Sequence, residues 1–364
     1  MSKETRPVLV LGGGVAGLTA ASALAAGRVP VVLVERARDL GGHGRLWPCM
    51  ATSTCQKCSA CLVEDAREAV TESRLVEIFT SWRVDKCIRG DGGFRVEAVP
   101  VEVPHADLEA RPVHCRAERS SPGPERRIWD VDALFVATGF RPFPAEKKPM
   151  LGYGKIPQVL TTVDLDFLVK QERIRSPWPG ADGNRRVAFL QCVGSRDREA
   201  GRDYCSQVCC KTSLRLANKL LADRPDLEIT VFYIDLQIHG KGFRQAFDDL
   251  KERVRFVQGV PSEVLPSEPD GAALVYEDPV SGVLKTESFG AVVLAVGMVP
   301  DEEAGDVASL LGLDRGMGGF FTVPEGTTDR VYLIGACLAP TDIAGARRQA
   351  LSAVARYLAS RGLR

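Results

Sequence analysis

Four cysteines within a short stretch are the first feature of this sequence that could do chemistry. Their thiolates are soft ligands, and four of them converging on one small object suit an iron–sulfur cube or a structural zinc ion. Two neighbouring thiols could instead form a redox-active dithiol. The spacing favours a metal, and a [4Fe-4S] cluster in particular, with the ligands Cys49, Cys55, Cys58 and Cys61.

A second group of cysteines lies in the middle of the chain. The apolar run RRVAFLQ ends at Cys192, and the stretch YCSQVCC supplies Cys205, Cys209 and Cys210. If residues 204–222 form a helix, Cys205 and Cys209 lie on one face at positions i and i+4, and Cys210 is displaced by one position. Cys192, at the end of the preceding strand, could close the set. These four cysteines predict a second metal site.

The bulk composition limits the partners and the compartment. Lys and Arg total 47 and Asp and Glu total 47, so no charge excess favours nucleic acid or an anionic membrane surface. The opening MSKETRPVLVLGGG lacks the regions of a secretory signal, and no apolar run reaches the roughly 20 residues of a membrane-spanning helix. We therefore expect a cytoplasmic protein, where clustered cysteines bind metals or do redox work. The isolated cysteines, expected to be packed residues, are Cys87, Cys115 and Cys337.

A nucleotide-binding motif precedes the first cysteine group. Gly12, Gly14 and Gly17 form G-x-G-x-x-G between an apolar strand and a helix, and Glu35 ends the next strand at the distance of a ribose-binding acid. Glycines let the backbone approach a pyrophosphate at the helix N-terminus. The pattern predicts a dinucleotide site at the start of a βαβ unit.

The sequence resembles the two-dinucleotide-binding-domain flavoproteins of the thioredoxin-reductase-like type. The resemblance is carried by Glu35-Arg36, Leu40-Gly41-Gly42, Ala137-Thr138-Gly139 and Leu333-Ile334-Gly335-Ala336. It implies an α/β fold in which FAD lies under the segment after Glu35 and a helix opened by Asp342 and Ile343 points at the flavin ring. His43, in the GGHGR loop, could hydrogen-bond the ring or be an ordinary loop residue. The implied cofactor-binding residues are Gly12, Gly14, Ala16, Gly17, Glu35, Arg36, Gly42, Ala137, Thr138, Gly139, Gly335, Asp342 and Ile343.

Two domains are expected from the length and from an internal echo. The stretches DALFVATGFRP and GAVVLAVGMVP share an apolar run, a glycine and a proline. The FAD-binding domain is expected to be discontinuous, over residues 1–145 and 291–364, with the cysteine motif 49–61 and a β-ribbon insertion at about 93–131. A second nucleotide-binding-like α/β domain, residues 146–290, carries the second cysteine group.

The second cysteine group makes the resemblance more specific. CVGSRD followed by YCSQVCC is similar to the flavin-containing HdrA component of heterodisulfide reductase and its relatives in quinone-linked sulfate respiration and sulfur oxidation. YIDLQIHGKGF and LGYGKIPQVLTTVDLD extend the likeness over nearly the whole chain. It implies FAD and a [4Fe-4S] cluster on Cys192, Cys205, Cys209 and Cys210. Many relatives add ferredoxin-like segments, which this sequence lacks, and its 49–61 motif is not their commonest version.

The family resemblance also implies partners and a role for one cation. A lysine often follows the double cysteine by five residues in the family; Arg215 stands there and could stabilise a reduced flavin. Whether that flavin bifurcates electrons is open. The implied partners are HdrB/HdrC-like subunits and an electron-donor or electron-acceptor protein, with a possible homodimer, no nucleic acid and no membrane insertion. LQCVGSRD replaces a second glycine motif, so direct NAD(P)H oxidation is not expected.

The predicted function is an oxidoreductase subunit that passes electrons between FAD and two [4Fe-4S] clusters to partner subunits. One alternative is a freestanding NAD(P)H-dependent flavin disulfide reductase that uses Cys58 and Cys61, or Cys49 and Cys55. The YLASRGLR ending lacks the histidine and glutamate that such enzymes supply from the carboxy-terminal motif. The other alternative is a structural scaffold protein that binds zinc.

Overall fold

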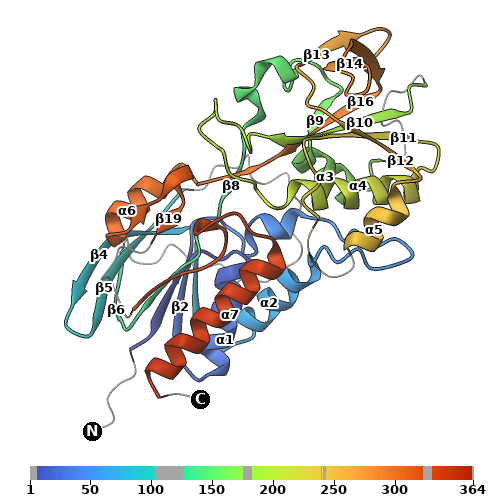
Figure 1. The fold of residues 1–364 in the computed structure, drawn as a ribbon. Coiled ribbons are helices and arrows are strands. Elements are labelled where there is room, and N and C mark those ends of the chain that lie inside the picture. Colours follow the sequence, from blue (N-terminus) through green and yellow to red (C-terminus); the bar gives the residue numbers. More distant parts are fainter. Residues whose placement is uncertain are drawn as a thin grey trace. The chain divides into compact units, whose positions relative to one another are not determined.

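The computed structural model describes residues 6–102, 126–174, 183–238, 240, 243–322 and 330–362. The chain divides into two compact units. Unit 1 comprises Met1–Leu46, Ser59–Phe140 and Pro300–Arg364, and unit 2 comprises Trp47–Cys58 and Arg141–Val299. Each unit is built on a five-stranded parallel sheet of its own (Figure 1).

The main sheet of unit 1 is parallel, and its five strands run in the order β20-β7-β1-β2-β3. Their bounds are β20 (Val331–Leu333), β7 (Leu134–Val136), β1 (Val8–Leu11), β2 (Val31–Glu35) and β3 (Val76–Thr80). Four helices accompany it: α1 (Val15–Ala26), α2 (Cys61–Thr71), α6 (Ala304–Leu311) and α7 (Ile343–Ser360). The nearly continuous apolar strands are typical of a parallel sheet covered on both faces.

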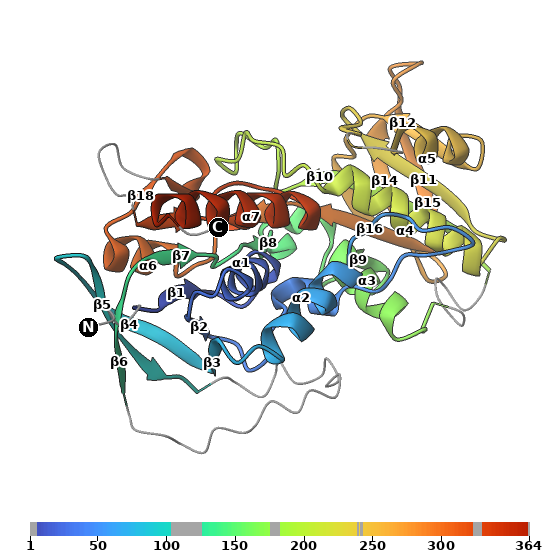
Figure 2. The same cartoon turned by 90° about the horizontal axis from the view of Figure 1, so that it is seen from below.

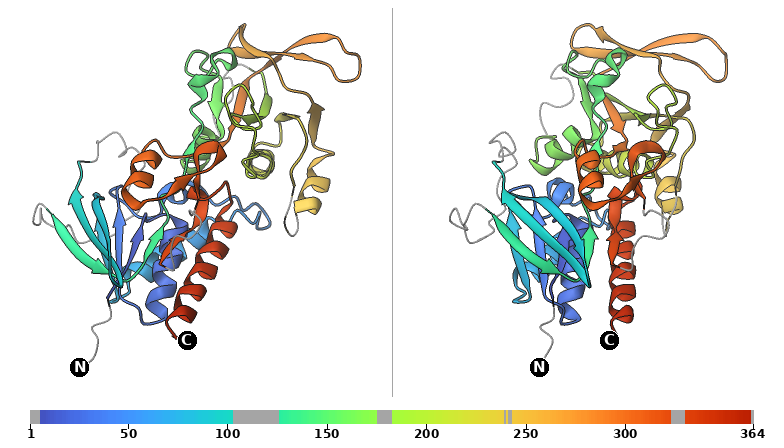
Figure 3. Two further views of the ribbon diagram at one scale, coloured as in Figure 1. Left: turned by 60° about the vertical axis from the view of Figure 1, so that its left-hand side comes forward. Right: turned by 90° about the vertical axis from the view of Figure 1, so that its left-hand side faces the viewer.

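Alternate residues of the unit 1 strands enter two different cores. Val8, Val10 and Leu33 pack with the small residues of α1 and with α7. Leu9 and Val34 pack on the opposite face, against a three-stranded antiparallel sheet and α6. Figures 2 and 3 show this layering, with red α7 on one side of the blue strands and the teal sheet on the other. The antiparallel strands are β4 (Trp82–Gly90), β5 (Gly93–Pro100) and β6 (Arg127–Val131).

Unit 2 repeats this plan. Its parallel sheet has the order β12-β11-β10-β16-β9. The strands are β12 (Val254–Gln258), β11 (Glu228–Tyr233), β10 (Arg186–Val193), β16 (Ala291–Val296) and β9 (Val159–Thr161). One face packs on helices α3 (Thr162–Lys170) and α4 (Cys209–Asp223), with α5 (Phe243–Leu250) alongside. The other face packs on an antiparallel sheet of β13 (Glu263–Ser267), β14 (Gly271–Glu277) and β15 (Leu284–Phe289).

The two similar stretches noted in the sequence have corresponding places in the two units. β7 and β16 carry the echoing stretches, and each is the neighbour of the central strand in its own sheet. Each also follows a three-stranded antiparallel insertion. Short pairs complete the units: β8 (Arg141–Pro142) with β17 (Met298–Val299), and β18 (Asp314–Arg315) with β19 (Phe321–Thr322).

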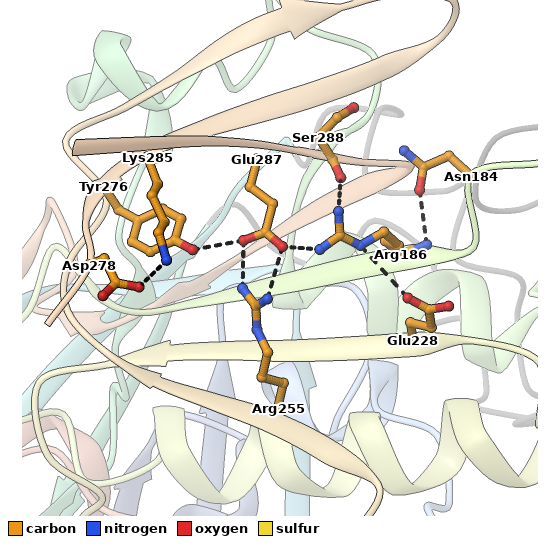
Figure 4. A network of polar contacts seen from close by, with 9 residues as sticks. All are labelled: Asn184, Arg186, Glu228, Arg255, Tyr276, Asp278, Lys285, Glu287 and Ser288. Carbon is orange, nitrogen blue, oxygen red and sulfur yellow. Dashed lines mark hydrogen bonds and ion pairs between the residues drawn. The ribbon is translucent and has the colours of Figure 1, made fainter. Parts of the chain in front are cut away.

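A network of ion pairs fastens the antiparallel sheet of unit 2 to its main sheet (Figure 4). Glu287 of β15 is contacted by Arg186 of β10, and it accepts hydrogen bonds from Arg255 of β12 at 2.9 and 2.5 Å. The Tyr276 hydroxyl donates to the same carboxylate at 2.8 Å. Cations and hydrogen bonds lower the pKa of Glu287 to about 2, although burial opposes them.

Candidate functional site

The glycine motif lies at the carboxyl edge of the unit 1 sheet, between β1 and α1. A Cβ at Gly12 would lie 2.4 Å from the Ala137 carbonyl oxygen, and one at Gly17 would lie 1.8 Å from the Gly12 carbonyl oxygen. Side chains at these two positions would clash with backbone. A Cβ at Gly14 or Gly139 would meet no atom within 4 Å, so the space above these two residues is open. That is the geometry a pyrophosphate needs.

Glu35 ends β2 beside this turn, as the sequence predicts. Its carboxylate accepts hydrogen bonds from the backbone N–H groups of Gly13 at 2.5 Å and Ala37 at 2.6 Å. Burial raises the pKa of Glu35, and these two N–H groups oppose the rise. Arg36 forms ion pairs with Asp301 and Glu303, at 3.7 and 2.5 Å. The Glu35 carboxylate is therefore held in one orientation. Arg36 has its carboxylate partners within unit 1.

The later motifs of unit 1 reach the same edge. The strand β7 is followed directly by Ala137, Thr138 and Gly139. Gly42 lies against the glycine turn, since a Cβ on Gly42 would lie 3.1 Å from the Gly14 Cα. A Cβ at Gly335 would lie 2.7 Å from the Ala16 Cβ, which places the two residues in contact. The structure thus brings the expected residues of all four motifs to one sheet edge.

The last helix of unit 1 begins where the sequence predicts. Asp342 is the N-cap of α7, and its side chain accepts a hydrogen bond from the Gly345 N–H at 2.7 Å. Ile343 is the first helical residue and is buried. Sequence reasoning missed Gln349, whose side-chain oxygen accepts from the Gly335 N–H at 2.9 Å. No sequence signal marked it, because the contact spans one helix and one loop.

His43 lies in the short helix Gly42–Leu46 beside the glycine turn. Its Nε2 is 2.9 Å from the Phe140 carbonyl oxygen, and the two rings lie 4.9 Å apart. Burial lowers the pKa of His43, and the Phe140 carbonyl opposes this. A neutral imidazole that donates from Nε2 keeps a lone pair on Nδ1. Its contact with a flavin ring stays a prediction.

The second cysteine group lines one pocket in unit 2. Cys192, Cys205, Cys209 and Cys210 form its wall together with Ser195, Arg196, Ser206, Gln207, Val208, Asp235 and Gln237. We call it the cysteine pocket. It lies where β10 ends and α4 begins, which is the place that the glycine turn occupies between β1 and α1 in unit 1.

The expected helix over residues 204–222 is wrong at its start. α4 begins at Cys209, and Cys205 lies in the preceding loop, so these two cysteines do not share a helix face. Gln207 has φ +61°, which breaks the helical path, and the Ser206 hydroxyl accepts a hydrogen bond from the Met298 N–H at 2.8 Å. Ser206 also lies 2.7 Å from the Ser195 hydroxyl. This hydroxyl pair fastens the loop to β17 and to the turn after β10.

The strand end is also shaped for the pocket. Cys192 has φ +63° and Gly194 has φ +73°, and a Cβ on Gly194 would lie 2.0 Å from the Phe143 ring. The left-handed backbone at Cys192 is uncommon for a residue with a side chain. Backbone strain of this kind is found at functional sites.

Burial keeps three of the pocket thiols protonated. It raises the pKa of Cys192 to about 12 and raises the pKa of Cys209 and of Cys210, and neighbouring thiols add to each rise. Arg196 opposes the rise at Cys192, and it forms an ion pair with Asp235 at the pocket. Neutral thiols are poor nucleophiles, so a dithiol exchange reaction is disfavoured here, whereas a bound metal would displace the protons.

The donor chemistry of the pocket fits a soft metal centre, since four sulfur atoms line one hollow. The Cys205 Sγ accepts from the Gln207 N–H at 3.3 Å, and N–H donors of this kind tune the potentials of iron–sulfur centres. Among the described residues, no group of three or more His, Cys, Asp and Glu side chains is arranged to hold a metal ion. Metal binding at either cysteine group therefore stays a proposal.

The first cysteine group is divided between the units. Cys49, Cys55 and Cys58 belong to the segment Trp47–Cys58 of unit 2, and Cys61 opens α2 of unit 1. Cys58 is half-buried against the core of unit 2. Arg215 of α4 contacts the backbone of this segment, at Gln56 and Lys57. The stabilisation of a reduced flavin by Arg215 stays a prediction.

Two of the isolated cysteines are packed residues, as expected. Cys337 is buried in unit 1, and Cys87 packs against the same core. Cys115 lies outside the described residues. No helix in the described part of the chain combines the length and the apolar character that crossing a membrane requires.

Comparisons with known proteins agree with these two units. The family described as NAD(P)-binding Rossmann-like domain matches residues 10–48, which contain the glycine turn and Glu35. In solved structures, thioredoxin reductase from T. acidophilum matches with a TM-score of 0.57 and 14% identity, covering 98% of both chains. Thioredoxin reductase from Lactococcus lactis matches with a TM-score of 0.54 and 16% identity, over 98% of this chain and all of its own. These likenesses establish the thioredoxin-reductase-like fold.

Curated sequences give a closer similarity. The HdrA component of the H(2):CoB-CoM heterodisulfide,ferredoxin reductase of Methanothermobacter marburgensis is 29% identical over 416 residues, covering 96% of this chain and 63% of the relative. The corresponding iron-sulfur component of the CoB–CoM heterodisulfide reductase of Methanocaldococcus jannaschii is 27% identical, covering 95% of this chain and 63% of its own length. The chain thus spans somewhat less than two thirds of these relatives.

Proposed function

This chain is a member of the HdrA-like family of heterodisulfide reductase components, and from that premise we propose that it is the electron-transferring flavoprotein of a heterodisulfide-reductase-like complex. It is an oxidoreductase that binds FAD in unit 1 and a [4Fe-4S] cluster in the cysteine pocket of unit 2. A second cluster is proposed on the Cys49–Cys61 group. The observation that carries the proposal is the pocket lined by four cysteines.

The proposed FAD site rests on the residues gathered at the edge of the unit 1 sheet. Gly14 and Gly139 leave open space for the pyrophosphate, and the N-terminus of α1 faces it. Glu35 supplies an oriented carboxylate for a ribose hydroxyl. The start of α7, capped by Asp342, offers a partial positive charge to the flavin ring. FAD, when bound, supplies both one-electron and two-electron exchange.

The proposed cluster site rests on topology and on donor chemistry. The pocket lies at the strand end and helix start that would hold a phosphate in a second nucleotide domain, and thiols occupy that turn instead. Cys209 and Cys210 open α4, where the helix dipole favours anionic ligands. Arg196 adds a positive charge beside Cys192. A cluster, when bound, supplies single-electron transfer.

The proposed partners follow from the relatives, whose names identify them as subunits of heterodisulfide reductases. We expect HdrB-like and HdrC-like subunits and a donor or acceptor protein to bring the disulfide and the outer electron source, with a homodimer of this chain as a further prediction. A cytoplasmic location belongs to the proposal because clustered free thiols persist in reducing compartments.

Anaerobic analysis of iron, acid-labile sulfide and flavin tests the proposal. About eight irons and one FAD per chain are expected if both cysteine groups hold a cube, and about four if only the pocket does. Cys209→Ser should remove the pocket's share of iron and sulfide, while Cys87→Ser, a change at a packed cysteine of unit 1, should remove none. A flavin-containing, catalytically competent preparation without iron would contradict the proposal and favour a dithiol reductase. Zinc in place of iron, with no reversible electron uptake, would favour a scaffold protein.

A further inference from the structure

The segment Trp47–Cys58 packs inside unit 2, although its neighbours along the chain on both sides belong to unit 1. Met50 is 4% exposed and lies in the core that α3 and α4 form on the main sheet. Cys58 packs against the same core. Figure 2 shows this blue segment running beside α4. The first cysteine group therefore takes part of its position from unit 2.

Arg215 of α4 holds this segment by its backbone. Its Nε donates to the Gln56 carbonyl oxygen at 3.0 Å, and its Nη2 donates to the Lys57 carbonyl oxygen at 2.6 Å. The guanidinium carbon lies 4.8 Å from the centre of the Phe243 ring. Two donors in a planar fork fix an orientation that a single ammonium group cannot fix.

The local backbone of the segment needs such a fixing contact. Lys57 has φ +51°, in the left-handed region, and so does Ser59 directly after the segment, with φ +64°. For residues with side chains this conformation costs free energy, and it persists where surrounding contacts hold it. The Lys57 carbonyl is one of the two that Arg215 binds.

Helix α4 also begins with two of the pocket cysteines. Cys209 and Cys210 are its first residues, and Arg215 follows Cys210 by five positions, a rise of about 7.5 Å along a helix. One rigid element therefore carries ligands of the cysteine pocket at its start and the anchor of the first cysteine segment in its second turn.

We propose that Arg215 is a positioning residue that docks the segment Gln56–Cys58 onto α4, so that Cys58 and the pocket cysteines Cys209 and Cys210 are placed by the same helix. This goes beyond the flavin-directed role expected from the sequence. The inference rests on the proposed function only for the metal that the segment would hold, because the docking itself is independent of that metal.

The test is anaerobic thiol labelling of the full-length, as-purified protein, with iron and sulfide measured on the same samples. The variants are Arg215→Met, which removes both donors, and Arg215→Lys, which keeps the charge but lacks the planar two-donor fork. Lys219→Met is the matched control, since Lys219 lies one turn further along α4 and pairs with Asp223. Mass spectrometry follows Cys58, with Cys87 of unit 1 as the internal reference.

Arg215→Met removes two charge-assisted hydrogen bonds and should raise the labelling rate of Cys58 by at least about tenfold, the ratio for the loss of one of them, and Arg215→Lys should give an intermediate rate. Cys87 and the Lys219→Met protein should be unchanged. If Arg215→Met loses about four of eight irons while the electron paramagnetic resonance signal of the pocket cluster is kept, that result would also show that the first cysteine group holds a cube. Faster Cys58 labelling, with about four irons in both the wild type and Arg215→Met, would support the docking and remove the first cluster from the proposed function. Wild-type labelling of Cys58 in Arg215→Met, or full rescue by lysine, would overturn the inference.

Discussion

At the scale of single residues, burial disfavours the charged form of several groups of unit 2. Asp166 of α3 is 7% exposed, and burial raises its pKa to about 7, while the charge of Arg215 opposes the rise. The same physical cause keeps the thiols of Cys192 and Cys209 protonated. Sequence patterns identified the cysteines as chemical groups. They did not show Asp166 as a buried acid, because TTVDLDFLV does not reveal which aspartate faces the core.

Asp166 makes folding stability depend on pH. Its pKa in the folded protein lies above the ordinary 3.8, so its contribution is complete below about pH 4 and is lost as the pH rises through about 7. The wild-type protein should therefore lose unfolding free energy between pH 5 and pH 8. We expect the Asp166→Asn protein to lose about 2 kcal/mol less than the wild type over the same range. Denaturant unfolding at both pH values measures this. The neighbouring Asp164→Asn is no matched control because Asp164 completes the capping box of α3 with Thr161, so exposed Glu172→Gln serves instead. An identical pH slope in Asp166→Asn and wild type would contradict the assignment.

At the scale of elements, the two parallel sheets were largely predictable and the loops between them were not. Runs of apolar residues bounded by glycines predicted the positions of β1, α1, β2, β10 and α7. The sequence did not reveal that α4 begins at Cys209, because the i and i+4 spacing of Cys205 and Cys209 is also the spacing of one continuous helix. The Ser195–Ser206 hydroxyl contact and the left-handed Gln207 interrupt it, and both depend on residues distant in sequence.

The network around Glu287 joins two elements and gives the opposite pH dependence. The pKa of Glu287 is held at about 2, below its ordinary value, so its stabilising contribution is complete above about pH 4.5 and is lost as the pH falls through about 2. We expect Glu287→Gln to lower the unfolding free energy by about 1 kcal/mol at pH 7, since partial exposure weakens the ion pairs. The deficit should shrink towards pH 3. Exposed Glu263→Gln, in the same small sheet, is the control. A deficit equal at both pH values would indicate lost packing and not lost charge pairing.

At the scale of the whole molecule, four strands of each main sheet follow the same order, β7-β1-β2-β3 in unit 1 and β16-β10-β11-β12 in unit 2. The turn after the central strand has different chemistry in the two units. Unit 1 places glycines there and unit 2 places cysteines. The echo between residues 132–142 and 290–300 made the repetition predictable from sequence. The assignment of Trp47–Cys58 to unit 2 was not predictable, because spacing within a segment does not reveal which core its side chains enter.

Because each unit has its own core, a substitution in unit 1 should remove the flavin without removing the iron of unit 2. Gly14→Val should fold, since the new side chain meets open space, but it should block a dinucleotide and lower bound flavin below about a tenth of wild type. The iron content assigned to the cysteine pocket should stay unchanged. Gly90→Val also adds a side chain in open space, at the end of β4, and should retain flavin. Flavin absorbance and iron analysis of the three proteins check this; full flavin in Gly14→Val would refute the assigned site.

The interleaved course of the polypeptide has a practical and an evolutionary consequence. The chain passes from one unit to the other after Leu46, Cys58, Phe140 and Val299. Neither unit can therefore be cut out as one uninterrupted fragment, and a recombination event with a single breakpoint cannot exchange either half for that of another protein. Redesign of this molecule has to proceed by point substitution or by grafting several stretches at once.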